Sequence, residues 1–307
     1  MTGTLPAGHG FATSQAEIRE IRAFTPERIP ALLASRRRRP FVPPDGRLMI
    51  VAADHPARGS LAARGRPDAM ANRAELLHRL VTALSRPGVD GVLGTADILE
   101  DLLLLGALEG KVVVSSMNRG GIQGAVFELD DRHTGYAVRD TVDAGFDAIK
   151  TLTRIDPDDP GSVRTLELCA RVATEANRAG LVCMVEPFLS RRIDGRVCND
   201  LSPDAVIRSI HIGQGLGGAS AYTWLKLPVV EQMERVMAAT TMPTLLLGGD
   251  PTAHPEETYA AWKAALELPA VRGLIVGRAL LFPEDDDVAA AVDTAVSLVR
   301  PQEVHVP

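Results

Sequence analysis

The chain contains few cysteines and no long apolar run, and both features narrow its class. Its three cysteines, Cys169, Cys183 and Cys198, show no CxxC spacing, and their odd number argues against a disulfide framework. No run of 18 apolar residues occurs, so we expect no membrane-spanning helix. The first residues, MTGTLPAGHGFATSQ, lack a charged segment followed by an apolar one, which disfavours secretion. We therefore expect a cytoplasmic protein.

The chain is also poor in lysine. Lys+Arg number 33 against 39 Asp+Glu, and the formal net charge of −6 disfavours a nucleic-acid or membrane partner. Only four of the 33 cations are lysines, at positions 111, 150, 226 and 263. The arginine run at 36–39 is expected to be the solvated end of a helix. Because the chain otherwise uses arginine, a lysine inside an apolar strand is informative.

A regular alternation of strand-like and helix-like segments begins at residue 47. It predicts a single (β/α)8 barrel, an α/β fold, over 46–300, with a helical extension over 1–45. A doubly wound open sheet is the alternative, but the first strand–helix turn, AADHPARGS, has no GxGxxG sequence. The expected strands are 47–54, 89–95, 111–116, 147–154, 181–187, 222–227, 242–249 and 272–278. The expected helices are 68–86, 96–108, 132–144, 161–179, 203–216, 229–240, 255–267 and 286–299.

Four charged residues interrupt these strands near their carboxyl ends, where barrels of this kind place their active sites. They are Asp54, Lys150, Glu186 and Lys226. Side chains alternate along a strand, and the last three share a face with apolar neighbours two residues away, such as Trp224. If these faces point inward, two lysines and two carboxylates meet in the barrel centre.

Two interpretations of this cluster are open. The simpler one is a pair of structural salt bridges, Lys150–Glu186 and Lys226–Asp54. The other is catalytic: arginine makes the better buried ion pair, whereas only lysine offers an amine that can lose its proton and attack a carbonyl. Burial and a second ammonium both lower the pKa of a lysine amine, which frees the nucleophile. The choice of lysine in an arginine-rich chain favours catalysis.

Glycines and an arginine follow the last two strands. Gly248, Gly249 and Gly277 could each be an ordinary tight turn. Together they occupy the seventh and eighth loops, where barrels commonly bind phosphate through backbone N–H groups. Arg278 adds a cation that can bind phosphate in a bidentate manner. We therefore predict a phosphate-binding site there.

Other polar residues are weaker candidates. His55, Ser115 and Asn118 lie at strand ends and are candidates for substrate contacts. The histidines at 55, 211 and 254 lack HxH or HxxxH spacing, so we expect no metal and no other cofactor. The glycine-rich segment 118–131 is either a lid or an interface arm. We expect a homo-oligomer with a small phosphorylated sugar as its ligand.

Taken in order, these residues resemble the class I (Schiff-base) aldolase family of (β/α)8 barrels, which includes archaeal-type fructose-bisphosphate, tagatose-bisphosphate and deoxyribose-phosphate aldolases. The resemblance covers about residues 45–285 and is carried by AADHP, AIKTL, MVEP, WLKLP, LLGGD and IVGRA. It implies that Lys226 forms the Schiff base and that Lys150 tunes it. It further implies that Glu186 moves the carbinolamine protons and that Asp54 binds a hydroxyl or assists C–C cleavage. Gly249, Gly277 and Arg278 match the phosphate site.

Two features depart from the bisphosphate-aldolase pattern. His55 is followed by Pro-Ala-Arg instead of glycine, and the fifth strand lacks a tyrosine. The likeness is closer to actinobacterial barrel proteins associated with myo-inositol catabolism. That resemblance implies 5-dehydro-2-deoxy-gluconate 6-phosphate as the substrate, cleaved to dihydroxyacetone phosphate and malonic semialdehyde.

Two other functions remain open because a fold does not fix a function. A phosphosugar isomerase or synthase on the same barrel would use a glutamate base without an essential amine. A sugar-phosphate sensor would keep the phosphate site without turnover.

Overall fold

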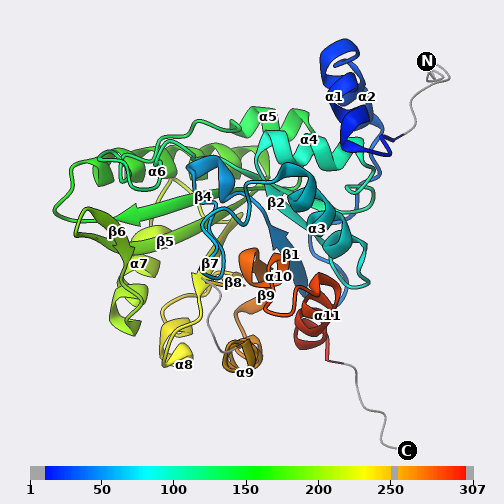
Figure 1. Ribbon diagram of the computed structural model, residues 1–307. Coiled ribbons are helices and arrows are strands. Elements are labelled where there is room, and N and C mark those ends of the chain that lie inside the picture. Colours follow the sequence, from blue (N-terminus) through cyan, green and yellow to red (C-terminus); the bar gives the residue numbers. More distant parts are fainter. Residues whose placement is uncertain (1–10, 250–254, 302–307) are drawn as a thin grey trace, which may run out of the picture.

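The computed structural model describes residues 11–249 and 255–301, and its centre is a closed barrel of eight parallel strands (Figure 1). β1 pairs with both β2 and β9, and the pairing of β4 with β5 completes the ring. The predicted (β/α)8 barrel is confirmed. The barrel strands are β1 (Leu48–Ala52), β2 (Gly91–Gly94), β3 (Val112–Ser116), β4 (Ala148–Ile155), β5 (Val182–Ile193), β7 (Thr223–Pro228), β8 (Thr244–Leu247) and β9 (Val271–Val276).

Helices cover the outside of the barrel, and alternate strand residues pack against them. In β1, Met49 and Val51 lie in the layer between strands and helices, whereas Leu48 and Ile50 point into the barrel. No described helix is long and apolar enough to cross a membrane. The covering helices are α3 (Arg73–Ser85), α4 (Ala96–Leu104), α5 (Val138–Asp143), α6 (Gly161–Ala179), α7 (Pro203–Gln214), α8 (Met233–Met237), α9 (Pro255–Leu266), α10 (Arg278–Leu281) and α11 (Val288–Val299).

The amino-terminal half of the barrel interior is apolar. Ile50, Met184 and Trp224 are buried there, and the ring of Phe41 meets the Trp224 ring edge-on at a centroid distance of 5.2 Å. The predicted inward face of β7 is correct for Trp224. Tyr222, which the expected strand 222–227 included, precedes β7 and is 41% exposed, so the inward face does not extend to it. Large apolar side chains thus close the amino-terminal end of the barrel.

Two helices precede the barrel, α1 (Gln15–Phe24) and α2 (Arg28–Ser35), and they lie beside α4 on its outer side (Figure 1). The prediction that the arginine run is solvated is wrong for Arg36, which is buried. Its guanidinium donates to the carbonyl oxygens of Lys111, at 2.9 Å, and Gly145, at 2.8 Å. A buried guanidinium can thus satisfy several carbonyls at once. The domain division at residue 45 stays a prediction.

Three connections differ from the sequence-based expectation. Residues 117–137 form a loop, whereas a helix was expected to begin at residue 132. A Cβ on Gly135 would lie 2.6 Å from the carbonyl oxygen of Ser116. This loop therefore lies tightly against the end of β3. Strand β5 runs on to Ile193 and forms an antiparallel hairpin with β6 (Arg196–Asn199). The helix expected over 229–240 is reduced to α8.

Candidate active site

A network of charged side chains lies in the carboxyl-terminal half of the barrel interior. Glu186 is at its centre, with Oε1 2.9 Å from Nζ of Lys226 and Oε2 2.8 Å from Nζ of Lys150. Nζ of Lys150 also lies 2.9 Å from Oδ2 of Asp54. Arg119 extends the network, with Nη2 2.7 Å from the same Asp54 oxygen. All five side chains are largely buried.

The strand register explains why these side chains meet. Met184 pairs with Lys150 on one side and with Trp224 on the other. Glu186 and Lys226 follow two residues after Met184 and Trp224, so they project from the same inward faces at the next level. The predicted convergence is therefore observed. The ion pairs differ from the simpler interpretation, because Lys226 pairs with Glu186 and not with Asp54.

The network keeps both carboxylates ionised. Burial raises the pKa of Glu186, but Lys150 and Lys226 lower it by more, so that it falls to about 2. Burial likewise opposes ionisation of Asp54, and Arg119 and Lys150 outweigh it, which places the pKa of Asp54 well below its usual range. Burial lowers the pKa of Lys150, and the two carboxylates only partly oppose this. Glu186 is thus an ionised acceptor in contact with two amines.

The predicted phosphate site lies at the ends of β8 and β9 and borders the same cavity. A Cβ on Gly277 would collide with the carbonyl oxygen of Ala52, and one on Gly248 would collide with Val276, so both positions require glycine. Gly249 has a φ of 65°, in the left-handed region. Arg278 lines the cavity beside these glycines. Phosphate binding here stays a prediction.

Two candidates for substrate contacts point away from the cavity. The hydroxyl of Ser115 is hydrogen-bonded to that of Thr141 at 2.7 Å, on the outer side of the barrel. The amide of Asn118 is used by the backbone of Leu152, to which it both donates, at 2.5 Å, and accepts, at 2.8 Å. The expectation for both residues is wrong in this structure. Strand alternation turns Ser115 outward, and Asn118 is hydrogen-bonded to the backbone of β4.

Ser116, which ends the same strand as Ser115, and Arg119, which the sequence analysis did not single out, take their place. The hydroxyl of Ser116 donates to Oδ2 of Asp54 at 2.9 Å. Arg119 donates to the carbonyl oxygen of Asp54 at 3.1 Å as well as to its carboxylate. Ser116 is the last residue of the third strand and Arg119 follows three residues later, so the strand-end rule that selected Asp54 also applies to Arg119.

Two of the three candidate histidines lie within the described residues, and they are separated in the fold. His55 lines the cavity, and burial lowers its pKa to about 3, so its ring is neutral at pH 7. His211 is exposed on α7, and His254 lies outside the described residues. Within 11–249 and 255–301, no group of three His, Cys, Asp or Glu side chains is placed to hold a metal ion.

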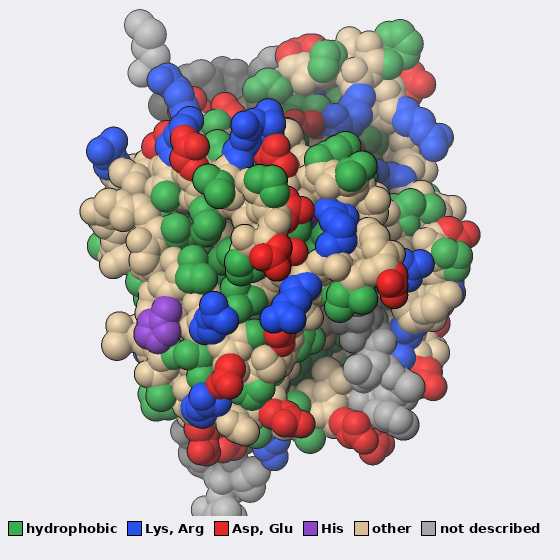
Figure 2. All heavy atoms as spheres, turned by 90° about the vertical axis from the view of Figure 1, so that its left-hand side faces the viewer, with side chains coloured by type: hydrophobic (Ala, Val, Ile, Leu, Met, Phe, Trp, Pro, Cys, Tyr) green, Lys and Arg blue, Asp and Glu red, His purple; other side chains and the backbone are tan. Residues whose placement is uncertain are grey.

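The network and the glycines share a cavity of about 1090 Å³. It opens on the face seen in Figure 2, where β4 and β5 end, and both acidic and basic side chains border the hollow. Seven cationic side chains and four carboxylates line it, although the whole chain carries a net charge of −6. The cations are Arg58, Arg119, Lys150, Arg154, Arg196, Lys226 and Arg278. This local excess of positive charge favours an anionic ligand.

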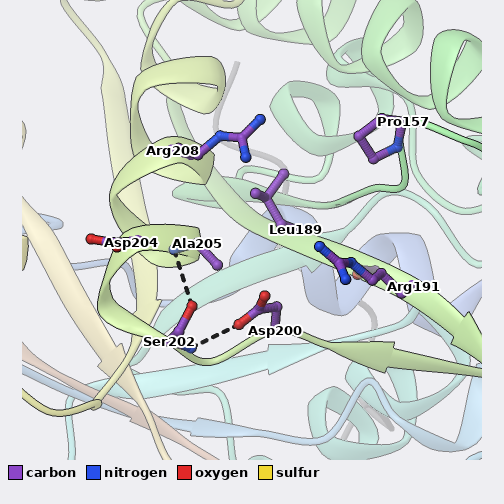
Figure 3. Close-up of a pocket in the computed structure, with 9 residues that line it drawn as sticks. Pro157, Leu189, Arg191, Asp200, Ser202, Asp204, Ala205 and Arg208 are labelled. Atoms are coloured by element: carbon purple, nitrogen blue, oxygen red, sulfur yellow. Dashed lines mark hydrogen bonds between the residues drawn. The ribbon is translucent and has the colours of Figure 1, made fainter.

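A second pocket of about 150 Å³ lies between β5 and the start of α7 (Figure 3). Two of its polar side chains are engaged in local structure. Ser202 accepts a hydrogen bond from the backbone N–H of Ala205, and the Ser202 N–H donates to Asp200. None of the predicted site residues lines it. The larger cavity is therefore the candidate active site.

Comparison with known proteins gives both a family and a fold. A family model described as Cgl0159-like matches residues 46–296. The crystal structure of Cgl0159 from Corynebacterium glutamicum (Brevibacterium flavum) is 58% identical, covers 92% of this chain and 96% of that chain, and superposes with a TM-score of 0.91. No curated protein matches significantly.

More distant structures share the barrel fold. A Schiff-base-forming fructose-1,6-bisphosphate aldolase is 21% identical, covers 88% of this chain and 99% of that chain, and has a TM-score of 0.60. An archaeal fructose-1,6-bisphosphate aldolase, whose catalytic Lys is covalently bound to a carbinolamine intermediate, is 20% identical, with the same coverage and a TM-score of 0.59. The family match spans most of the barrel, and the chain belongs to the Cgl0159-like family.

Proposed function

We propose that this protein is a class I aldolase that cleaves a phosphorylated keto-sugar or keto-sugar acid through a Schiff base on Lys226. The observation that carries the proposal is the position of Glu186, which contacts the amines of both Lys226 and Lys150 at the base of a cationic cavity. The fold is that of structures described as Schiff-base aldolases, which supports the same chemistry.

The proposed reaction begins when Lys226 transfers its proton to Glu186, 2.9 Å away. The free amine attacks the substrate ketone, and a proton passes from the attacking nitrogen to the resulting oxyanion to give a neutral carbinolamine. Glu186 then protonates the hydroxyl, which leaves as water, and the C=N bond of the iminium forms. In this scheme Lys150 provides the second cation that keeps Glu186 ionised between the steps.

The iminium then accepts the electron pair of the breaking C–C bond. A base removes the proton of the hydroxyl on the far carbon, that carbon becomes the carbonyl of the released aldehyde, and the lysine-bound fragment becomes an enamine. Asp54 is our candidate for this base, because it is ionised and lines the cavity beside Lys150. Protonation and hydrolysis of the enamine release the ketone product and restore Lys226.

The proposed substrate is 5-dehydro-2-deoxy-gluconate 6-phosphate, with dihydroxyacetone phosphate and malonic semialdehyde as products. Its support is the sequence likeness described above together with the cationic lining of the cavity. A substrate with both a phosphate and a carboxylate suits such a lining.

Borohydride trapping tests the proposal. The protein is incubated with 5-dehydro-2-deoxy-gluconate 6-phosphate or with fructose 1,6-bisphosphate, reduced, digested and mapped by mass spectrometry. We expect an adduct on Lys226 and none on Lys263, which is exposed on α9. An adduct on Lys150 alone would exchange the two roles, and cleavage without any adduct would refute the covalent mechanism.

A further inference from the structure

Arg58 lines the cavity beside the charged network, and one of its guanidinium nitrogens is buried without a partner among the described residues. It ends η1 (Pro56–Arg58), a short 3-10 helix that follows β1. Its carbonyl oxygen accepts a hydrogen bond from the N–H of Gln123 at 2.9 Å, so its backbone is held against the 117–137 loop. Its Nη1 atom is shielded from solvent, yet within residues 11–249 and 255–301 it has no hydrogen-bond partner. Burying a hydrogen-bond donor without an acceptor costs free energy, so we expect this atom to bind an acceptor on a ligand.

Most charged neighbours of Arg58 are already engaged. Arg119 binds Asp54, and Arg154 binds Glu128 with Nη1 2.6 Å from Oε1. Asp131 accepts a hydrogen bond from the N–H of Gly121 at 2.9 Å through Oδ1, and its Oδ2 lies 3.7 Å from Nη2 of Arg154. Burial and repulsion by Arg154 and Arg119 lower the pKa of Arg58 to about 10, although Asp131 and Asp54 oppose this. Arg58 is therefore still charged at neutral pH, and no carboxylate of the described residues forms an ion pair with it.

The strand order places this region across the cavity from the predicted phosphate site. Around the ring, β4 is the fourth strand from β9 in either direction, and β3 is the fourth from β8. Arg154 lies on β4 and Arg119 follows β3, whereas Gly277 follows β9 and Gly249 follows β8. Arg119 and Arg154 therefore lie across the barrel mouth from the glycine site. Arg58 itself follows β1, next to β9, and the charges that act most on its guanidinium are those of Arg154 and Arg119.

We infer that Arg58 binds a second anionic group of the substrate, at the end opposite the phosphate held by Gly248, Gly249, Gly277 and Arg278. The substrate then carries an anion at each end of its carbon chain, and the second anion is a carboxylate or a phosphate, both of which suit the guanidinium fork. Lys226 lies on β7, next to β8, and so meets a carbonyl nearer the phosphate end. This inference rests on the proposed function for the identity of the reacting site, and it defines the substrate class.

Binding of molecules that cannot form a Schiff base tests the inference separately from the chemistry. The probes are 6-phosphogluconate, glucitol 1,6-bisphosphate and glucitol 6-phosphate, titrated into the wild type, Arg58→Gln and Arg66→Gln by calorimetry. Arg66 is exposed in the same β1–α3 connection and does not line the cavity, so it is the matched control.

We expect the wild type to bind at least one doubly anionic probe about 10- to 100-fold more tightly than glucitol 6-phosphate, the range for one charge-assisted contact. Arg58→Gln should remove this preference and leave the affinity for glucitol 6-phosphate unchanged, which also shows that the variant is folded. A larger loss of affinity for 6-phosphogluconate in this variant would identify the second anion as a carboxylate, and a larger loss for glucitol 1,6-bisphosphate would identify it as a phosphate. Arg66→Gln should behave as the wild type.

Equal affinity of the wild type for all three probes would overturn the inference, as would an equal loss for all three in Arg58→Gln. Borohydride trapping in the wild type tests the Schiff-base proposal independently of these titrations. Cleavage without an adduct would refute the Schiff base and leave the binding result unaffected, so failure of the proposed function and failure of this inference can be distinguished.

Discussion

The two halves of the barrel interior are built on the same strands and differ completely in chemistry. Met184 and Trp224 fill the amino-terminal half with apolar contacts, and two residues further along the same strands Glu186 and Lys226 form a buried ion pair. Apolar packing stabilises a fold directly, whereas burying an ion pair costs about as much desolvation energy as its attraction returns. The charged half is therefore better explained by chemistry than by stability.

The largest effect should follow from replacing the proposed nucleophile. Lys226→Arg keeps the cation beside Glu186 but removes the amine, so we expect turnover to fall roughly 10³-fold or more and the borohydride adduct to disappear. Trp224→Phe, two residues earlier on β7, should keep the adduct. If Lys226→Arg still formed a borohydride adduct, Lys226 would not be the nucleophile, and the assignment of the charged half of the barrel to chemistry through this residue would be wrong.

The next effect should be on stability. Glu186→Gln leaves two buried ammonium groups facing a neutral amide, and we expect a loss of about 3–5 kcal/mol in the free energy of unfolding. Met184→Ala, in the apolar half of the same strand, should cost about 2–5 kcal/mol through its cavity but spare trapping at Lys226. Denaturant unfolding measures both losses. The exposed Glu231→Gln serves as a control that should change nothing.

The pH dependence separates these two losses. The pKa of Glu186 in the folded protein, about 2, lies below its ordinary value of 4.5, so ionised Glu186 stabilises the fold above the ordinary value. This contribution is lost as the pH falls from about 4.5 towards 2. The stability difference between wild type and Glu186→Gln should therefore shrink between about pH 6 and pH 3, by about 2 kcal/mol. The Met184→Ala difference should stay constant, and a flat difference for Glu186→Gln would show that its carboxylate is not held ionised.

How far the sequence predicts this molecule also differs between regions. Strand alternation placed Lys150, Glu186 and Lys226 on converging faces because a strand has a fixed period of two. Arg58 and Arg119 were not singled out, since both lie in connections that have no period. Ser115 and Ser116 show the limit of the rule, because the facing of a strand's last residues depends on register, which only the pairing of β3 with β4 reveals.

A smaller effect should follow from the phosphate side of the cavity. Arg278→Ala should raise KM for phosphorylated substrates about 10- to 100-fold with little change in kcat, if the contact acts equally in ground and transition states. Arg272→Ala, at an exposed position of β9, the strand that precedes Arg278, should leave KM unchanged. Equal weakening of phosphorylated and unphosphorylated substrates in Arg278→Ala would refute the phosphate assignment.

Chelation should have the smallest effect, because the charged half of the barrel supplies its own electron sink. In the proposed reaction the iminium on Lys226 accepts the electrons of the breaking C–C bond, a role that a divalent ion would otherwise take by polarising the carbonyl. We therefore expect the rate of aldol cleavage to be unchanged after dialysis against EDTA, with EDTA already saturated with Zn²⁺ as the control. A loss of turnover that Zn²⁺ restores would assign the polarisation to a metal. The Lys226–Glu186 pair would then be a structural ion pair, and the two halves of the barrel would differ only in the kind of contact that fills them.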